Sequence, residues 1–98
     1  MLTIGNVTLD SNVILSPMAG FSDVALRVLS RRHGAGLVCT EMVNATAVNR
    51  DVIRTQKLML VLGEERPTCI QIFGSKSEEV AASCKKVEAQ CDIVGFNF

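Results

Sequence analysis

Short apolar runs rich in β-branched residues alternate along this chain with longer segments of mixed polarity. The runs predict strands at residues 13–15, 37–40, 68–73 and 92–98. The last run, from Cys91 to Phe98, is typical of a parallel strand that is buried on both faces. A parallel strand needs a crossover to reach its neighbour, so the fold is expected to be cut within a repeating strand–helix unit.

Helical spacing of apolar residues predicts three helical segments between these strands. The first is expected to take Ser22 as its N-cap and to end before Gly34. Its expected apolar stripe consists of Val24, Ala25, Val28 and Leu29. The second, from Asn44 to about Leu60, is expected to be helical only in parts, because its many β-branched residues lower helix propensity.

The third helix is expected to begin with a capping box, Ser75-Lys76-Ser77-Glu78. Its buried face is expected to consist of Val80, Cys84, Val87 and Cys91. Residues 63–67 are expected to form a loop, because they combine glycine, charged residues and proline. Near the N-terminus, a Gly5-Asn6 turn between two short apolar runs predicts a small hairpin.

Strict alternation of strands and helices predicts the fold class. Three strand–helix units followed by a fourth strand favour a right-handed parallel α/β array. The spacing of the strand starts is compatible with the first four strands of a (β/α)8 TIM barrel, preceded by the short hairpin. A doubly wound sheet is the alternative, because alternation alone is the same in both folds.

Composition narrows the class of protein further. The chain has 98 residues, enough for one domain at most, and 48% of them are hydrophobic, which favours a buried α/β sheet. Ten acidic and ten basic side chains cancel, so no global field attracts nucleic acid or an anionic membrane. No segment approaches the roughly twenty apolar residues of a membrane-spanning helix, and no signal peptide is expected.

The cysteines indicate a reduced, cytoplasmic protein rather than a metal protein. Cys39, Cys69, Cys84 and Cys91 contain no C-x-x-C pair, and His33 is the only histidine. A zinc site needs about four closely spaced soft ligands, so no metal is expected. Because each cysteine lies in an apolar run, all four are expected to be core thiols.

Candidate ligand-binding residues lie where the predicted strands end, because parallel α/β folds bind ligands beyond the carboxyl ends of their strands. The segments at these ends are 16–20, 40–42, 71–74 and 97–98. They are polar at few points and apolar around them, which favours a flat aromatic cofactor over a sugar or a metal. Neither of the common glycine-rich phosphate-binding motifs occurs in the sequence.

Two polar residues stand out at these strand ends. Gln71 lies within an apolar strand, where its amide either bonds a polar group of a neighbouring strand or contacts a ligand. An amide both donates and accepts, which matches the imide edge of a ligand ring. Glu41 lies between Thr40 and Met42 and is expected either to recognise a substrate or to brace a buried arginine.

Four segments, in this order, resemble the tRNA-dihydrouridine synthases and together span nearly the whole chain. They are Ser16-Pro17-Met18-Ala19-Gly20-Phe21-Ser22-Asp23 followed by Arg27, Gly34-Ala35-Gly36-Leu37-Val38 with Thr40-Glu41-Met42, Gln71-Ile72-Phe73-Gly74-Ser75, and Asp92-Ile93-Val94 through Asn97-Phe98. The first segment alone would be unspecific, since other flavin barrels share similar turns.

The resemblance implies a (β/α)8 barrel that binds FMN and a helical C-terminal domain that helps to hold tRNA. It implies an RNA-binding cytoplasmic flavoprotein that reduces the 5,6 double bond of uridine with NADPH. Residues 1–98 would then be the N-terminal half of the barrel, without its second half and without the helical domain. In this half, Pro17, Met18 and Ala19 would line the flavin, Gln71 would bond its polar edge, and Asn97 would lie near the flavin and the target base.

The sequence departs from the family pattern at two points. Gly95 stands where the family usually has an acidic residue. In the family, Gly-Cys-Pro follows the asparagine, and its cysteine is the general acid, but this chain ends first. No catalytic residue is therefore expected among these 98 residues, and the isolated chain is expected to be inactive and to bind FMN weakly.

The sequence is also compatible with two other functions. The chain could belong to another FMN-dependent barrel oxidoreductase that acts on a small molecule. It could also be a non-catalytic half-barrel that associates with itself through its open strand edges.

Overall fold

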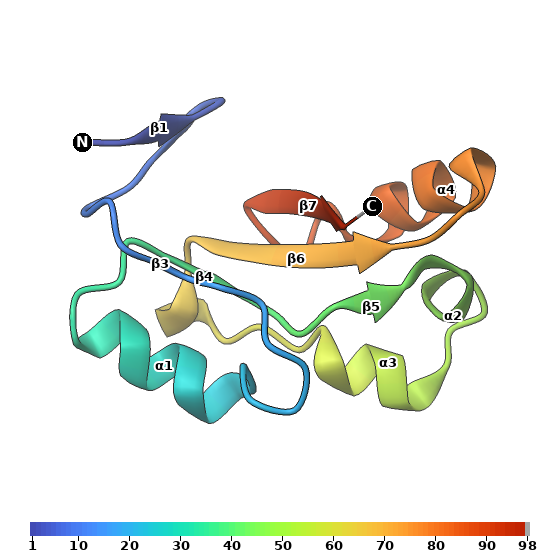
Figure 1. Ribbon diagram of the computed structural model, residues 1–98, viewed down its shortest axis with the longest axis horizontal. Helices are drawn as coiled ribbons and strands as arrows, with labels where there is room; N and C mark the ends of the chain where they lie inside the picture. Colours follow the sequence, from blue (N-terminus) through green and yellow to red (C-terminus); the bar gives the residue numbers. More distant parts are fainter. Residues whose placement is uncertain (98) are drawn as a thin grey trace.

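A sheet of parallel strands runs through the computed structural model, which describes residues 1–97 (Figure 1). Its neighbouring strands are β3 (Ile14–Leu15), β4 (Leu37–Cys39), β6 (Thr68–Phe73) and β7 (Ile93–Asn97), in this order. Each is parallel to the next. The expected parallel α/β alternation is confirmed, although Phe98, the predicted end of the last strand, lies outside the described residues.

A further strand, β5 (Val43–Asn44), was missed in the sequence because it lies in a stretch expected to be partly helical. It continues the path of β4 along the same side of β6. Val38 pairs with Thr68, and Val43 pairs with Ile72, so five residue steps on one strand face four on the other. One extra residue is therefore accommodated between β4 and β5, as in a β-bulge.

The helices connect these strands. They are α1 (Val24–Arg32), α2 (Ala45–Asn49), α3 (Ile53–Leu58) and α4 (Ser77–Val87), with a 3-10 turn, η1 (Gly63–Glu65), before β6. The expectation of partial helix after Asn44 is confirmed, and Asp51, with φ of 54°, lies between the two short helices. No helix within residues 1–97 has both the length and the apolar character needed to cross a bilayer.

The predicted starts of the first and third helices were wrong in detail. Asp23, not Ser22, caps α1, because its Oδ1 accepts the Leu26 N–H at 2.9 Å. Ser22 is instead fully buried, with its hydroxyl bonded to the preceding loop. The capping box expected at Ser75 does not form, because α4 begins after Lys76, whose side chain makes no cap hydrogen bond.

The predicted apolar stripe of α1 was wrong for only two of its four residues, since Val24 and Val28 are half-buried. Ala25 is exposed, and Leu29 is 53% exposed, whereas Arg27 is buried to 1%. An arginine can occupy this position because acceptors surround its guanidinium, which offsets the cost of burying the charge. Hydropathy alone could not identify the inward face of this helix.

Alternate residues of β6 divide the core between the two faces of the sheet. On the helix side, the buried cluster consists of Val43, Ala45, Val48, Met59, Ile70, Ile72, Val87 and Cys91. Val80 and Cys84 pack against this cluster, so the predicted inward face of α4 is confirmed. On the other face, the buried cluster consists of Leu9, Leu37, Cys39 and Cys69.

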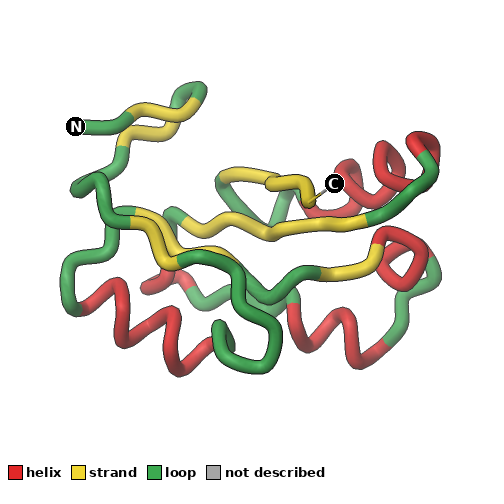
Figure 2. The backbone as a smooth tube through the Cα atoms, viewed as in Figure 1, coloured by secondary structure: helices red, strands yellow, loops and turns green. Residues whose placement is uncertain are grey.

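The predicted N-terminal hairpin is confirmed as β1 (Thr3–Ile4) paired antiparallel with β2 (Val7–Thr8). Gly5 adopts φ of 59° in its turn, a conformation that favours glycine. Figures 1 and 2 show the hairpin near the amino ends of the strands, away from the edge where β5 and β6 end. Leu9, which follows the hairpin, is fully buried and covers the sheet face opposite the main helical cluster.

The last strand is less buried than expected. Ile93 and Val94 are half-buried and Phe96 is 45% exposed, so β7 is not covered on both faces. Within residues 1–97, β7 pairs only with β6 and forms an edge of the sheet. All four cysteines are free thiols, as expected, and of these only Cys84 is not fully buried.

Candidate functional site

A cavity of about 430 Å³ opens beyond the carboxyl ends of β5, β6 and β7. Its lining residues are Met42, Asn44, Phe73, Gly74, Ser75 and Asn97. These strand ends converge because Phe73 pairs with Asn44 on one side and with Asn97 on the other. The cavity therefore lies at the edge of the sheet where the sequence predicts the ligand-binding residues.

Asn97 is the predicted site residue that lines this cavity. Its Nδ2 donates to the Sδ of Met42 at 2.9 Å. A thioether is a weak acceptor, so an oxygen of a ligand could replace it at little energetic cost. Within residues 1–97, the Asn97 amide is thus placed at the cavity without a strong partner for this donor.

Gln71 lies on the same face of the sheet as Asn97. Gln71 pairs with Gly95, and Phe73, two residues further along β6, pairs with Asn97. Residues two apart on a strand point to the same face. The Gln71 side chain is half-buried, and within residues 1–97 its amide makes no hydrogen bond. The alternative in which Gln71 bonds a polar group of a neighbouring strand is therefore not seen in the described part of the chain.

Pro17, Met18 and Ala19 lie apart from this cavity, on the loop that joins β3 to α1. This loop follows the carboxyl end of β3, so it belongs to the same edge of the sheet as Gln71 and Asn97. Met18 is 37% exposed and Ala19 is also exposed. The structure thus places the predicted residues at one edge but brings only Asn97 into the cavity lining.

The loop itself is closed by hydrogen bonds to Ser22. The Ser22 hydroxyl accepts the Met18 N–H at 2.9 Å and donates to the Met18 carbonyl at 3.1 Å. The Ser22 carbonyl accepts from Arg27 Nη1 at 2.7 Å. The backbone at Met18 is therefore linked, through one buried serine, to the interior face of α1.

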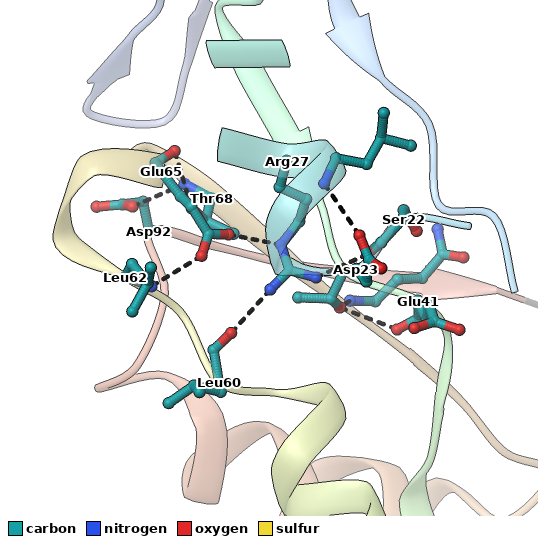
Figure 3. A network of polar contacts seen from close by, with 12 residues as sticks. Ser22, Asp23, Arg27, Glu41, Leu60, Leu62, Glu65, Thr68 and Asp92 are labelled. Carbon is teal, nitrogen blue, oxygen red and sulfur yellow. Dashed lines mark hydrogen bonds and ion pairs between the residues drawn. The ribbon is translucent and has the colours of Figure 1, made fainter. Parts of the chain in front are cut away.

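A buried ion pair anchors this arrangement (Figure 3). The Nε of Arg27 contacts Oε1 of Glu65 at 2.5 Å, with exposures of 1% and 0%, and Nη2 donates to the Leu60 carbonyl at 2.8 Å. The second carboxylate oxygen of Glu65 accepts the Leu62 N–H at 2.8 Å. Because each charged group has several partners, the pair can persist without water.

Sequence reasoning missed Glu65 and considered Glu41 as the brace of an arginine. Arg27 and Glu65 are 38 residues apart, and Glu65 lies in a segment that was expected to be only a loop. Glu41 instead accepts the Gly20 N–H at 2.5 Å. No local pattern distinguishes Glu65 from the exposed Glu64 beside it, so only the fold identifies the buried carboxylate.

Two thiols lie on the same face of the sheet as Gln71, because Cys69 is two residues before it on β6. Cys39 and Cys69 are directly paired on adjacent strands, and both are buried. Their mutual hydrogen bond lowers the pKa of Cys39, and that bond together with burial raises the pKa of Cys69. A Cβ at Gly95 would lie 3.0 Å from the Cys69 sulfur. Glycine at this position therefore leaves room for the buried thiol, which accounts for the departure from an acidic residue.

Parallel strands that alternate with helices define the class of the protein as α/β, a class in which ligands bind beyond the carboxyl ends of the strands. A family model described as "Dihydrouridine synthase (Dus)" matches residues 14–98. The chain belongs to the dihydrouridine synthase family.

Curated relatives agree with this assignment. The chain is 35% identical to a probable tRNA-dihydrouridine synthase of Rickettsia conorii, across 100% of this chain and 30% of the relative. It is 37% identical to tRNA-dihydrouridine synthase B of Pseudomonas putida, across 96% and 28%. It is 42% identical to a probable tRNA-dihydrouridine synthase of Aquifex aeolicus, across 88% and 28%. The chain thus spans about 30% of the length of the first of these relatives.

Proposed function

We propose that this chain is the N-terminal part of an FMN-dependent oxidoreductase that reduces uridine to 5,6-dihydrouridine in tRNA, with NADPH as reductant. Family membership supports the reaction class, and the names of the relatives support tRNA as the substrate. The observation that carries the proposal is the placement of the Gln71 and Asn97 amides on one face at one edge of the sheet. Cytoplasmic localisation is part of the same proposal.

We propose further that residues 1–98 form the first half of a (β/α)8 barrel. The strand order follows the sequence, apart from β5, which extends β4. A doubly wound sheet would carry helices on both faces, whereas residues of α2, α3 and α4 here pack in one cluster on one face of β6 and Leu9 covers the other face. The second half of the barrel and a helical tRNA-binding domain would lie on further chain, as the length of the relatives suggests.

The residues at the strand ends fit a flavin. The Gln71 amide is half-buried and has no partner within residues 1–97, which suits a ring edge that both donates and accepts. Met18 and Phe73 offer partly exposed apolar surface at the same edge of the sheet. A bound FMN would supply hydride transfer, chemistry that no amino-acid side chain provides.

The chain's own residues would bind and orient rather than transfer protons. Gln71 would fix the rotation of the ring through its amide, and Asn97 would exchange its contact with Met42 for one with a ligand. Pro17, Met18 and Ala19 would exclude water from one side. The general acid would come from chain beyond residue 98, because Cys39 and Cys69, the thiols on the face that carries Gln71, are buried in the core cluster with Leu9 and Leu37.

The activity is tested with full-length protein, unmodified tRNA transcript and NADPH. We expect nucleoside mass spectrometry to show a mass gain of one hydrogen molecule at specific uridines. Omission of NADPH should abolish the gain. Unchanged tRNA, with NADPH oxidised in the presence of a small cyclic substrate, would instead favour an oxidoreductase of another substrate class.

Substitution of Gln71 tests the cofactor site. Gln71→Leu keeps the volume but removes the amide, so FMN affinity of the full-length apoprotein is expected to fall about tenfold or more. Flavin fluorescence quenching measures the affinity. Gln90→Leu, at an exposed position after α4, is the matched control and should bind FMN normally. Equal affinities for the two variants would rule out a flavin contact at Gln71.

A further inference from the structure

A carboxylate from the β4–β5 segment holds the middle of the β3–α1 loop. Oε1 of Glu41 accepts the Gly20 N–H at 2.5 Å, a short bond of the charge-assisted kind. Gly20 has φ of 80°, and no heavy atom lies within 4 Å of the Cβ position. The backbone therefore turns in a left-handed conformation at the residue whose N–H meets the carboxylate.

The rest of the loop is tied to the interior from its other end. The Met18 carbonyl accepts N–H groups from Phe21 at 3.0 Å and from Ser22 at 2.9 Å. Ser22 is in turn bonded to Arg27, the buried arginine of α1. These bonds hold the loop against α1. Within the described residues, Glu41 makes the only side-chain hydrogen bond to this loop from the strand side.

Glu41 occupies the bulge between β4 and β5, next to Met42. Adjacent residues on a regular strand point to opposite faces, but the extra residue in this segment re-aims its side chains. Glu41 bonds the loop that carries Met18, and Met42 receives the amide of Asn97. Two neighbouring residues on one bulge thereby touch both parts of the proposed cofactor site, which are far apart in the sequence.

We propose that Glu41 is a positioning residue that shapes the cofactor site before the cofactor enters. Its carboxylate holds the backbone at Gly20 and so sets the position of Pro17, Met18 and Ala19 relative to the strand ends. This inference rests on the proposed function, because it concerns the site for FMN. It assigns Glu41 neither of the roles expected from the sequence, substrate recognition or an arginine brace.

Three variants of the full-length protein test the role. Glu41→Ala removes the acceptor, and FMN affinity, measured by fluorescence quenching, is expected to fall about tenfold. Glu41→Gln keeps an oxygen acceptor and should stay within about threefold of the wild type. Glu64→Ala, an exposed carboxylate on η1, is the control and should not change affinity.

Amide hydrogen exchange gives a readout that does not depend on FMN. In the apoprotein, the Gly20 N–H is expected to exchange faster in Glu41→Ala than in the wild type, while amides of β6 keep their protection. If Glu41→Ala does not fold, Glu41→Asp replaces it. The shorter side chain withdraws the acceptor and should weaken FMN binding while the charge is kept.

The outcomes separate the inference from the proposed function. Wild-type protein that fails to bind FMN would overturn both. Wild-type protein that binds FMN, together with a Glu41→Ala variant of equal affinity and equal Gly20 exchange, would overturn only the positioning role. Equal weakening by Glu41→Gln and Glu41→Ala would also overturn it, because charge rather than a hydrogen bond to Gly20 would then be responsible.

Discussion

Replacement of Glu65 by leucine is expected to destabilise the full-length protein by about 3–5 kcal/mol. The substitution replaces the carboxylate by an apolar side chain of similar volume and leaves Arg27, at 1% exposure, without its counter-charge. It also removes the acceptor of the Leu62 N–H. The loss is large because a buried charge that loses its partner cannot regain water.

Urea denaturation followed by circular dichroism measures this effect, and a neighbouring ion pair provides the control. Arg32 and Glu64 join the same helix and turn but are 66% and 50% exposed. Glu64→Leu should therefore cost at most about 1 kcal/mol. The double variant Arg27→Met with Glu65→Leu should recover part of the loss, because no uncompensated charge remains. A double variant less stable than Glu65→Leu would contradict this account.

Replacement of Gly36 by alanine is expected to destabilise the protein by about 3 kcal/mol or more. A Cβ at Gly36 would overlap the carbonyl oxygen of Ser11 and lie 2.9 Å from the Ser11 carbonyl carbon and nitrogen. All three are backbone atoms, so they cannot rotate aside as a side chain would. The Gly36 N–H also donates to the Val13 carbonyl at 2.8 Å, so retreat of this segment would break a bond that positions β3 beside β4.

Gly63→Ala is the matched control for this clash. No heavy atom lies within 4 Å of a Cβ at Gly63, and its φ is not left-handed. Alanine there should leave the stability within about 1 kcal/mol of the wild type, with a small gain from reduced freedom of the unfolded chain. Thermal melts of the full-length variants give the comparison. Similar melting temperatures for the two variants would show that the approach of Ser11 to Gly36 is not fixed in solution.

The elements that could be predicted from the sequence are those whose pattern is local. The strand at Thr68–Phe73 was predicted with its observed bounds because an apolar run ends at a glycine. The inward face of α4 followed from the spacing of Val80, Cys84 and Val87. Each pattern depends on residues within a few positions of one another, where the periods of strand and helix act directly.

Part of the candidate site could be predicted in the same way. Parallel pairing and the two-residue period of a strand are sufficient to place Gln71 and Asn97 on one face. The cavity lining around Asn97 was not predicted, because it depends on β5, a strand of two residues inside a segment with helical spacing. So short a strand has no periodicity of its own and exists only because β6 offers it a partner.

The sequence by itself determined the class of fold, the edge of the sheet that carries the polar groups, and the family. Only the tertiary structure decided which charged side chains are buried and what they bind. Glu65, not Glu41, meets Arg27, and Glu41 holds Gly20. The physical reason is that a hydrophobic pattern specifies which face turns inward, whereas the partner of a buried charge depends on segments brought together from distant parts of the chain.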